Sequence, residues 1–272
     1  MHDLWFHVHV PKAGGSTLRQ LMNRNFGKGY YNSVSLLESK QYTRQDVWEI
    51  AKSQPWLRCM SDHKLSLDLP YDFPDAAVHA YAFVRDPVDR YISRYFYHRN
   101  ADIECAAKTA SDFREFINYE LVEGHVEPHV RSQLCFLNQG RALDDLSVVE
   151  QALETKRAFL FPVERFDEAA VCLEAMFPQT FRDLSYVRVN QAERTYPVDD
   201  ETMAILGQRL ADDRPLYDLA CQELERCIEQ CFPYREDFDI ALRDFQARGV
   251  VRRDNFNPLF LERGFPAQKA AA

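Results

Sequence analysis

The sequence predicts one α/β domain in which a helical second half folds onto a parallel sheet. Two segments have the composition of buried strands, and each runs through a short turn directly into a helix. The residues after the second unit are mainly helical in periodicity. The 272 residues are 46% hydrophobic, which is enough for one large core. We therefore expect a single domain over residues 1–272, with the end from about residue 250 a candidate flexible tail.

The first strand-to-helix unit opens the chain. Residues 4–10 are rich in β-branched and aromatic side chains and end at Pro11, which predicts a buried strand. A glycine-containing loop follows, and Ser16 and Thr17 are suited to cap the next helix. The apolar residues of that helix recur at helical spacing, at Leu18, Leu21 and Met22.

The second unit is the apolar segment 77–84, which stops at Arg85 and is followed by Pro87. Proline suits the first turn of a helix, so we expect a helix over residues 88–99. Between the units we expect a helix over 43–53, capped by Thr43, and a strand over 57–62. Both loops then lie at strand carboxyl ends, where open α/β sheets bind ligands.

The remaining chain is predicted to be helical apart from one strand over residues 158–163. The expected helices cover residues 111–123 with a serine cap, 129–138, 146–156, 166–177, 200–210, 216–231 and 236–247. There is no internal repeat or low-complexity tract, which favours a single domain.

Charge and hydropathy exclude several classes of partner. The net charge is -9, and no Lys/Arg block resembles a basic arm, so we expect no nucleic-acid partner. Any anionic ligand must be held by a local cluster. The first apolar stretch is too short to span a bilayer and lacks a signal-cleavage pattern, so we expect a cytoplasmic protein with no integral membrane segment. The sequence does not indicate the oligomeric state.

The seven cysteines indicate neither a disulfide framework nor a metal site. They form no C-x-x-C pair. Cys227 and Cys231 lie four residues apart on a predicted helix, but no second pair completes a tetrahedral site. We interpret them as reduced core thiols and expect no metal.

The first loop has the composition of an anion site. Gly14 and Gly15 let the backbone turn so that N–H groups and the helix N-terminus face a phosphate, and Lys12 adds a positive charge. In a Walker A loop the lysine follows the last glycine, whereas here it precedes the glycines. The G-x-G-x-x-G pattern is also missing, so an ordinary P-loop NTPase and a dinucleotide fold are disfavoured. The alternative is a plain turn with a surface lysine.

The second loop suits another phosphate. Arg85 closes a strand, and Ser93 falls in the second turn of the following helix, where its side chain can reach back toward that strand end. The nearby charged residues Asp86, Arg90 and Arg94 have an alternative interpretation of equal weight. They can form ion pairs at i,i+4 spacing on the surface, with Arg90 and Arg94 turned outward.

Two motifs carry a resemblance to a known family. Residues 9–17 resemble the 5′-phosphosulfate loop, and residues 83–95 the 3′-phosphate motif, of carbohydrate sulfotransferases. The nearest likeness is to the heparan sulfate 2-O-sulfotransferase group and its bacterial relatives. It extends over roughly residues 4–230 in order and spacing, and is tight only in these two motifs. Weaker echoes lie at 159–167 and 216–220.

The resemblance implies a P-loop-like α/β fold and 3′-phosphoadenosine 5′-phosphosulfate (PAPS) as the donor. It assigns the 3′-phosphate to Arg85 and Ser93, and further nucleotide contacts to Arg194 and Thr195. It assigns contacts with the acceptor to His129 and Arg131. The alternative is that this segment is only the solvent-facing side of a helix. The residues on the 5′ side are Lys12, Ala13, Gly14, Gly15, Ser16 and Thr17.

Sulfuryl transfer needs an activated acceptor oxygen and a neutralised leaving oxygen. The resembled group uses a histidine at the end of a strand between the two motifs, and His63 stands there. We therefore expect His63 to be the base, with a structural histidine as the alternative, and Lys12 to stabilise the bridging oxygen. The three other strand histidines are expected to be packed in the core; they are His7, His9 and His79.

The expected acceptor is a hydroxyl of a carbohydrate, a glycolipid or a small metabolite. Two other functions stay open at this stage. A small-molecule kinase would use the same loop chemistry, although no Walker B pattern is found. A non-catalytic nucleotide-binding module would keep the pocket without the transfer.

Overall fold

The computed structural model describes residues 2–32, 42–67, 73, 76–100, 105–126, 131–138, 145–155, 157–187 and 198–254. Its centre is a five-stranded sheet with the order β2-β3-β1-β4-β5, in which every neighbouring pair is parallel. The strands are β1 (His2–Val8), β2 (Tyr30–Asn32), β3 (Cys59–Asp62), β4 (Ala76–Val84) and β5 (Ala158–Pro162). A parallel sheet flanked by helices confirms the predicted P-loop-like α/β class.

Four of the strands lie where the sequence predicts them, with ends shifted by up to two residues. The fifth, β2, was missed. It has only three residues, Tyr30–Asn32, and pairs with β3 at the edge of the sheet. A segment this short has no apolar run that a sequence pattern could detect.

Helices make up most of the rest of the described chain, and the helical second half is confirmed. They are α1 (Gly15–Phe26), α2 (Arg44–Ser53), α3 (Pro87–Asn100), α4 (Ala106–Thr109), α5 (Phe113–Ile117), α7 (Leu134–Leu137), α8 (Ser147–Glu154), α9 (Phe166–Met176), α10 (Asp200–Arg209), α11 (Arg214–Cys231) and α12 (Arg235–Asp254). Short 3-10 turns occupy Gly27–Gly29, Val163–Arg165 and Ala211–Asp213, and a π-helix occupies Asn118–Val122.

Several helix ends differ from the prediction. Thr43 does cap α2, in a capping box with Asp46. The N-cap of α1, however, is Gly14 rather than Ser16 or Thr17, because the loop enters the helix two residues earlier. The N-cap of α5 is Asp112 and not a serine, since its carboxylate accepts from the N–H of Glu115.

Two predicted segments have the wrong length. Within the expected helix 129–138, α7 covers only Leu134–Leu137, while residues 127–130 lie outside the described part. Helix α12 runs to Asp254, so residues 250–254 are helical and not part of a tail. Arg252, in its last turn, is held by the carboxylate of Asp183. None of the described helices is long and apolar enough to cross a bilayer.

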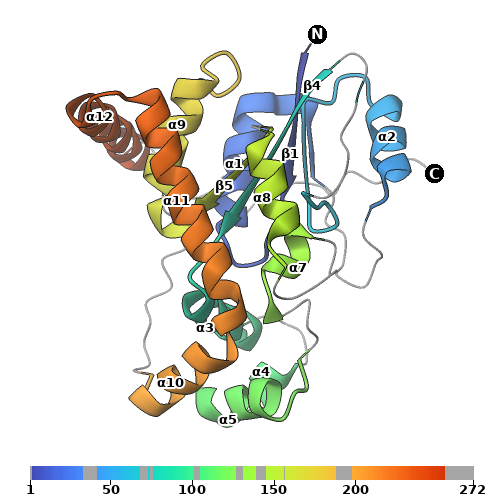
Figure 1. Cartoon of the computed structure of the whole chain (residues 1–272), viewed down its shortest axis with the longest axis vertical. Coiled ribbons are helices and arrows are strands. Elements are labelled where there is room, and N and C mark those ends of the chain that lie inside the picture. The colour runs from blue at the N-terminus through green and yellow to red at the C-terminus, as the bar shows by residue number, and fades with distance from the viewer. Residues whose placement is uncertain are drawn as a thin grey trace.

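The apolar residues form two clusters. The larger one surrounds the sheet and includes the fully buried Trp5 and Phe6 of β1. The smaller one joins α3, α4, α5 and α10 around Tyr91 and Phe116. In Figure 1 these four helices gather below the sheet, beyond the end of β1 opposite the N-terminus. The carboxyl ends of the strands therefore face a helical layer, and the two predicted ligand loops lie between them.

Candidate active site

The loop between β1 and α1 has a backbone shaped for an anion. Lys12 has φ 67°, and among the described residues it is the one non-glycine with positive φ; Gly14 follows with φ 84°. Gly14 is the N-cap of α1, and no side chain caps that helix. The first N–H groups of α1 are thus left for a ligand, and the helix dipole favours negative charge there.

Both glycines of the loop are required by their surroundings. A Cβ at Gly14 would lie 2.8 Å from Cγ2 of Val163, and the positive φ adds strain. A Cβ at Gly15 would lie 1.8 Å from Nε2 of His9. The His9 imidazole therefore packs directly against the start of α1.

Lys12 places its ammonium group between the loop and α3. Its Nζ lies 3.9 Å from the ring centre of Tyr97. Burial and the neighbouring charge of Arg85 lower the pKa of Lys12 to about 8. Ser93 stands four residues before Tyr97 and so lies on the same face of α3. The helix thus turns Ser93 toward the side on which Lys12 sits.

The backbone of Arg85, at the end of β4, is held in place by hydrogen bonds to Gln133. The side-chain amide of Gln133 accepts from the N–H of Arg85 at 2.9 Å and donates to its carbonyl at 2.7 Å. The guanidinium then lies beside the loop, with Nη1 3.5 Å from the carbonyl oxygen of Lys12. Its Nε is 3.8 Å from Glu164 and is buried without a hydrogen bond to the described residues. An under-satisfied guanidinium next to Lys12 fits an oxyanion.

The charged residues that follow Arg85 do not form surface pairs at i,i+4 spacing. The alternative interpretation, in which Arg90 and Arg94 turn outward, is therefore wrong. Arg90 is 1% exposed and donates to the carbonyl of Arg131. Arg94 pairs with Glu120, in contact with the second apolar cluster. The reason is that α3 packs against α4 and α10 and, at Arg90, against the segment that carries Arg131, so its charged residues need buried partners.

The carboxylate of Asp86 caps α3 instead of pairing along it. Its Oδ1 accepts from the N–H groups of Val88 at 3.0 Å and Asp89 at 3.1 Å, and Oδ2 accepts from Arg214 at 2.9 Å. The cap fixes the start of the helix that carries Ser93 and Tyr97.

His63 follows β3 directly and meets the loop through His9. Its Nδ1 lies 2.6 Å from the carbonyl oxygen of His9, and the two rings stack with centres 4.0 Å apart. A carbonyl only accepts, so Nδ1 carries the hydrogen and Nε2 of the neutral ring keeps its lone pair. Burial lowers the pKa of His63, which favours this neutral form. The carboxylate of the neighbouring Asp62 accepts from the hydroxyl of Tyr42 at 3.1 Å and from the N–H of Lys64 at 2.9 Å.

The other strand histidines differ in position. His7 is buried against Ser61, its Nδ1 2.7 Å from Oγ, and burial lowers its pKa to about 3. His79 stacks on Trp5, away from the loop. His7 lies in the core, as predicted, whereas His79 is partly exposed and lies 3.6 Å from the carboxylate of Asp3. His9 does not belong with them, because its ring fills the space between the loop and His63.

The sequence matches the sulfotransferase family over residues 2–220. The chain belongs to the sulfotransferase family. Among solved structures, a sulfotransferase from Alicyclobacillus acidocaldarius is similar at 16% identity and TM-score 0.45, covering 84% of this chain and 99% of that one. Mouse sulfotransferase SULT7A1 in complex with PAP is similar at 15% identity and TM-score 0.42, covering 91% and 89%. No curated protein sequence matches significantly.

The sulfotransferase brings most of the sequence-predicted residues together, while Arg131 is engaged elsewhere. Its guanidinium lies 3.1 Å from Asp212. Three predicted residues lie outside the described part, namely His129, Arg194 and Thr195. In the part of the sulfotransferase that the structure describes, no three metal-ligating side chains converge.

Three residues of the site escaped sequence reasoning: Tyr97, Gln133 and Glu164. Tyr97 stands four residues after Ser93, and that helical spacing was a usable signal. Gln133 and Glu164 reach the site only through the tertiary fold, although Glu164 lies within the weak motif echo at residues 159–167. Glu164 accepts from the N–H of Asp86 at 3.1 Å, so it steadies the turn that aims Arg85.

Proposed function

We propose that this sulfotransferase moves the sulfuryl group of PAPS to a hydroxyl of a carbohydrate or another hydroxylated acceptor. The observation that carries the proposal is the adjacency of two anion-binding elements. The loop presents the N-terminus of α1, and Arg85 reaches to 3.5 Å from the Lys12 carbonyl with its Nε still without a hydrogen bond to described residues. One ligand with phosphate groups at both ends of a nucleoside would satisfy both elements. ATP has no 3′-phosphate to offer Arg85.

In this proposal the loop and Lys12 hold the donor and neutralise its leaving group. The acceptor oxygen forms a bond to sulfur while the bond from sulfur to the bridging oxygen breaks, which releases 3′-phosphoadenosine 5′-phosphate. Negative charge grows on that bridging oxygen. A lysine ammonium and helix N–H groups directed at this oxygen stabilise it more strongly as the charge develops. In this way they would lower the barrier to transfer.

His63 accepts the proton that the acceptor hydroxyl loses. Nδ1 is committed to the His9 carbonyl, so Nε2 is the atom free to take the proton. The contact with His9, which itself packs on Gly15, ties the position of the base to the donor loop. His9 is thus a positioning residue in this proposal, and Lys12 and His63 are the catalytic pair.

The deciding experiment compares two nucleotides by calorimetry. We expect 3′-phosphoadenosine 5′-phosphate to bind equally well with EDTA and with Mg²⁺, and at least about tenfold tighter than ATP–Mg. Arg85→Ala should remove most of this preference. Arg209→Ala is the matched control, because Arg209 is an exposed arginine of α10. Equal affinity for both nucleotides, or a requirement for Mg²⁺, would contradict the proposal and favour a kinase.

The same proteins show whether the pocket is catalytic. Incubation with PAPS and a panel of sugars, glycolipids and phenols should release 3′-phosphoadenosine 5′-phosphate in proportion to a sulfated product. Tight binding with no turnover on any acceptor would identify a non-catalytic binding module. The carbohydrate acceptor, a cytoplasmic location, a single domain and the absence of a metal stay predictions.

A further inference from the structure

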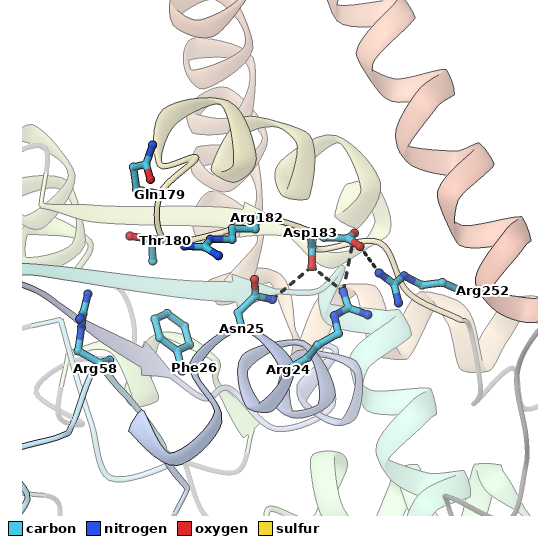
Figure 2. Close-up of a pocket in the computed structure, with 9 residues that line it drawn as sticks. All are labelled: Arg24, Asn25, Phe26, Arg58, Gln179, Thr180, Arg182, Asp183 and Arg252. Carbon is cyan, nitrogen blue, oxygen red and sulfur yellow. Dashed lines mark hydrogen bonds and ion pairs between the residues drawn. The ribbon is translucent and has the colours of Figure 1, made fainter.

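A second concentration of positive charge lies around a cavity of about 500 Å³ (Figure 2). Its walls come from the last turn of α1, the turn before β3, the segment after α9 and the last turn of α12. The lining residues are Arg24, Asn25, Phe26, Arg58, Gln179, Thr180, Arg182, Asp183 and Arg252. Four arginines thus face one aspartate.

This cavity is separate from the donor loop. Helix α1 begins at the loop with Gly15 and ends at the cavity with Phe26. Its 12 residues correspond to about 18 Å at 1.5 Å per residue. The cavity lies where the strands begin, at the opposite end of the sheet from Lys12, Arg85 and the other described residues assigned to the donor.

The aspartate of the cavity is already shared among several arginines. The carboxylate of Asp183 accepts from Arg252 and, at 3.0 Å, from Arg248, and it lies 3.9 Å from Arg24. Arg24 is otherwise bound to backbone, donating to the carbonyls of Asp183 at 2.6 Å and Ser185 at 2.7 Å. Glu174, which does not line the cavity, pairs with Arg248 at 2.7 Å. Asp183 is left to balance Arg24 and Arg252, and one carboxylate cannot neutralise two guanidinium groups.

Arg58 and Arg182 add further positive charge, and neither is paired with an acidic residue that lines the cavity. Arg58 is exposed, and its Nε donates to the carbonyl of Asp3 at 3.2 Å. Arg182 is exposed and forms no ion pair with residues of the described ranges. In a chain with a net charge of -9 such an excess of arginine is a local exception. The charges also oppose one another: burial and then Arg252 are the main causes that lower the pKa of Arg24.

We propose that this cavity is a second oxyanion site, which takes the phosphate or sulfate group of a small molecule. Guanidinium groups match the planar, multidentate geometry of these anions, and a bound anion would neutralise the excess charge that Asp183 leaves. The ring of Phe26 beside Arg58 gives the cavity an apolar side, and its volume lies in the range of small-molecule sites (Figure 2). The site therefore suits an ester-linked group as well as a free anion.

The test is made in a Lys12→Ala background, which weakens the loop site, and uses inorganic pyrophosphate as the probe at constant ionic strength. Calorimetry should detect binding to Lys12→Ala, and adding Arg58→Ser and Arg182→Ser should weaken it at least about tenfold. The matched control adds Lys52→Ser and Arg209→Ser, which remove the same charge from exposed positions in α2 and α10. The control should bind as the parent does.

Melting curves in chloride check that all variants are folded, and Arg182→Ser alone carries the test if the double change unfolds the chain. Glucose 6-phosphate and glucose 6-sulfate then distinguish the source of the anion. Tighter binding of an ester would assign the site to a phosphorylated or sulfated metabolite, and tighter binding of pyrophosphate to a free anion. The proposal is overturned if pyrophosphate binds no better than chloride, or if removing the cavity arginines and removing the control charges have the same effect.

Discussion

The two ends of α1 present positive charge in different ways. At its start, the loop of residues 11–15 offers backbone N–H groups, two residues with positive φ, and a single lysine. At its end, the cavity offers side chains of Arg24, Arg58, Arg182 and Arg252, which come from four separate segments. A backbone-built site depends on the geometry of consecutive residues. A side-chain-built site depends on the fold that gathers distant ones.

The two regions also differ in chemistry. Beside the loop stands His63, with one nitrogen held by the His9 carbonyl and burial lowering its pKa. Among the described residues that line the cavity there is no histidine, and Asp183 is engaged with arginines. We therefore expect reaction at the loop and binding alone at the cavity.

The largest expected effect tests this division. His63→Ala should slow transfer by about 10²–10⁴-fold, the usual loss of a general base, and leave the affinity for 3′-phosphoadenosine 5′-phosphate within about twofold. Single-turnover transfer from PAPS and calorimetry measure the two quantities. His125→Ala, at an exposed histidine, is the control. Retained transfer in His63→Ala would give the base role to another group, and lost nucleotide affinity would make His63 a structural residue.

A single methyl group tests how strictly the loop depends on its backbone. Gly15→Ala should weaken nucleotide binding about ten- to a hundredfold, because the new Cβ would meet Nε2 of His9 at 1.8 Å. His9 has little room to move, since its ring is stacked on His63. Pyrophosphate binding at the cavity should not change.

The companion variant identifies the cause. His9→Ala with Gly15→Ala removes the collision and should bind nucleotide more tightly than Gly15→Ala alone. If the double variant is no better, the loss comes from the helix start itself and not from His9.

The same contrast explains how far the sequence predicted the molecule. The strand, glycine loop and helix of residues 4–26 were predictable because strand, turn and helix signals are local and follow one another directly. Arg85 was singled out for the same reason, because it directly follows the strand and stands two residues before Pro87. The buried state of Arg90 was not predicted, because periodicity shows one face of α3, whereas the segment that carries Arg131 covers a further side of this helix.

The cavity could not have been predicted from any window of sequence. The residues next to these arginines in the sequence form no recognisable motif. Only the packing of α12 against the segment after α9 brings Arg252 to Asp183. Even the C-terminal end of α12 was placed seven residues too early, at 247 instead of Asp254, which left Arg252 out of the expected helix. Gln133 and Glu164 escaped for the same reason, because each serves the site from a distant segment.

The pH dependence of binding distinguishes lysine from arginine. Burial and Arg85 lower the pKa of Lys12 to about 8, so this lysine loses its charge as the pH rises through that value. A bound anion holds the proton, and nucleotide affinity should therefore fall about tenfold between about pH 7 and pH 9. Lys12→Arg should give a flat profile, since arginine stays charged. Calorimetry across this range is the measurement.

The cavity provides the internal comparison for that titration. Pyrophosphate bound by its arginines should show no such fall between about pH 7 and pH 9 in the Lys12→Ala background. A parallel fall at both sites would mean that the ligand or the fold titrates, and not Lys12.

The smallest expected effect concerns Tyr97, the side chain that supports Lys12 from α3. Its ring centre is 3.9 Å from Nζ, and at an exposed position such a contact contributes about 0.5–1 kcal/mol. Tyr97→Leu should thus weaken nucleotide binding about two- to fivefold, because Lys12 loses the ring that orients it. Tyr97→Phe keeps the ring and should bind like the parent, and Tyr234→Leu, at another exposed tyrosine, is the control for loss of an aromatic surface residue. Because Ser93 lies on the same face of α3, a larger loss in Tyr97→Leu would show that the helix itself has shifted and has taken Ser93 with it. If Tyr97→Phe were as weak as Tyr97→Leu, the hydroxyl and not the ring would be the group that serves the loop.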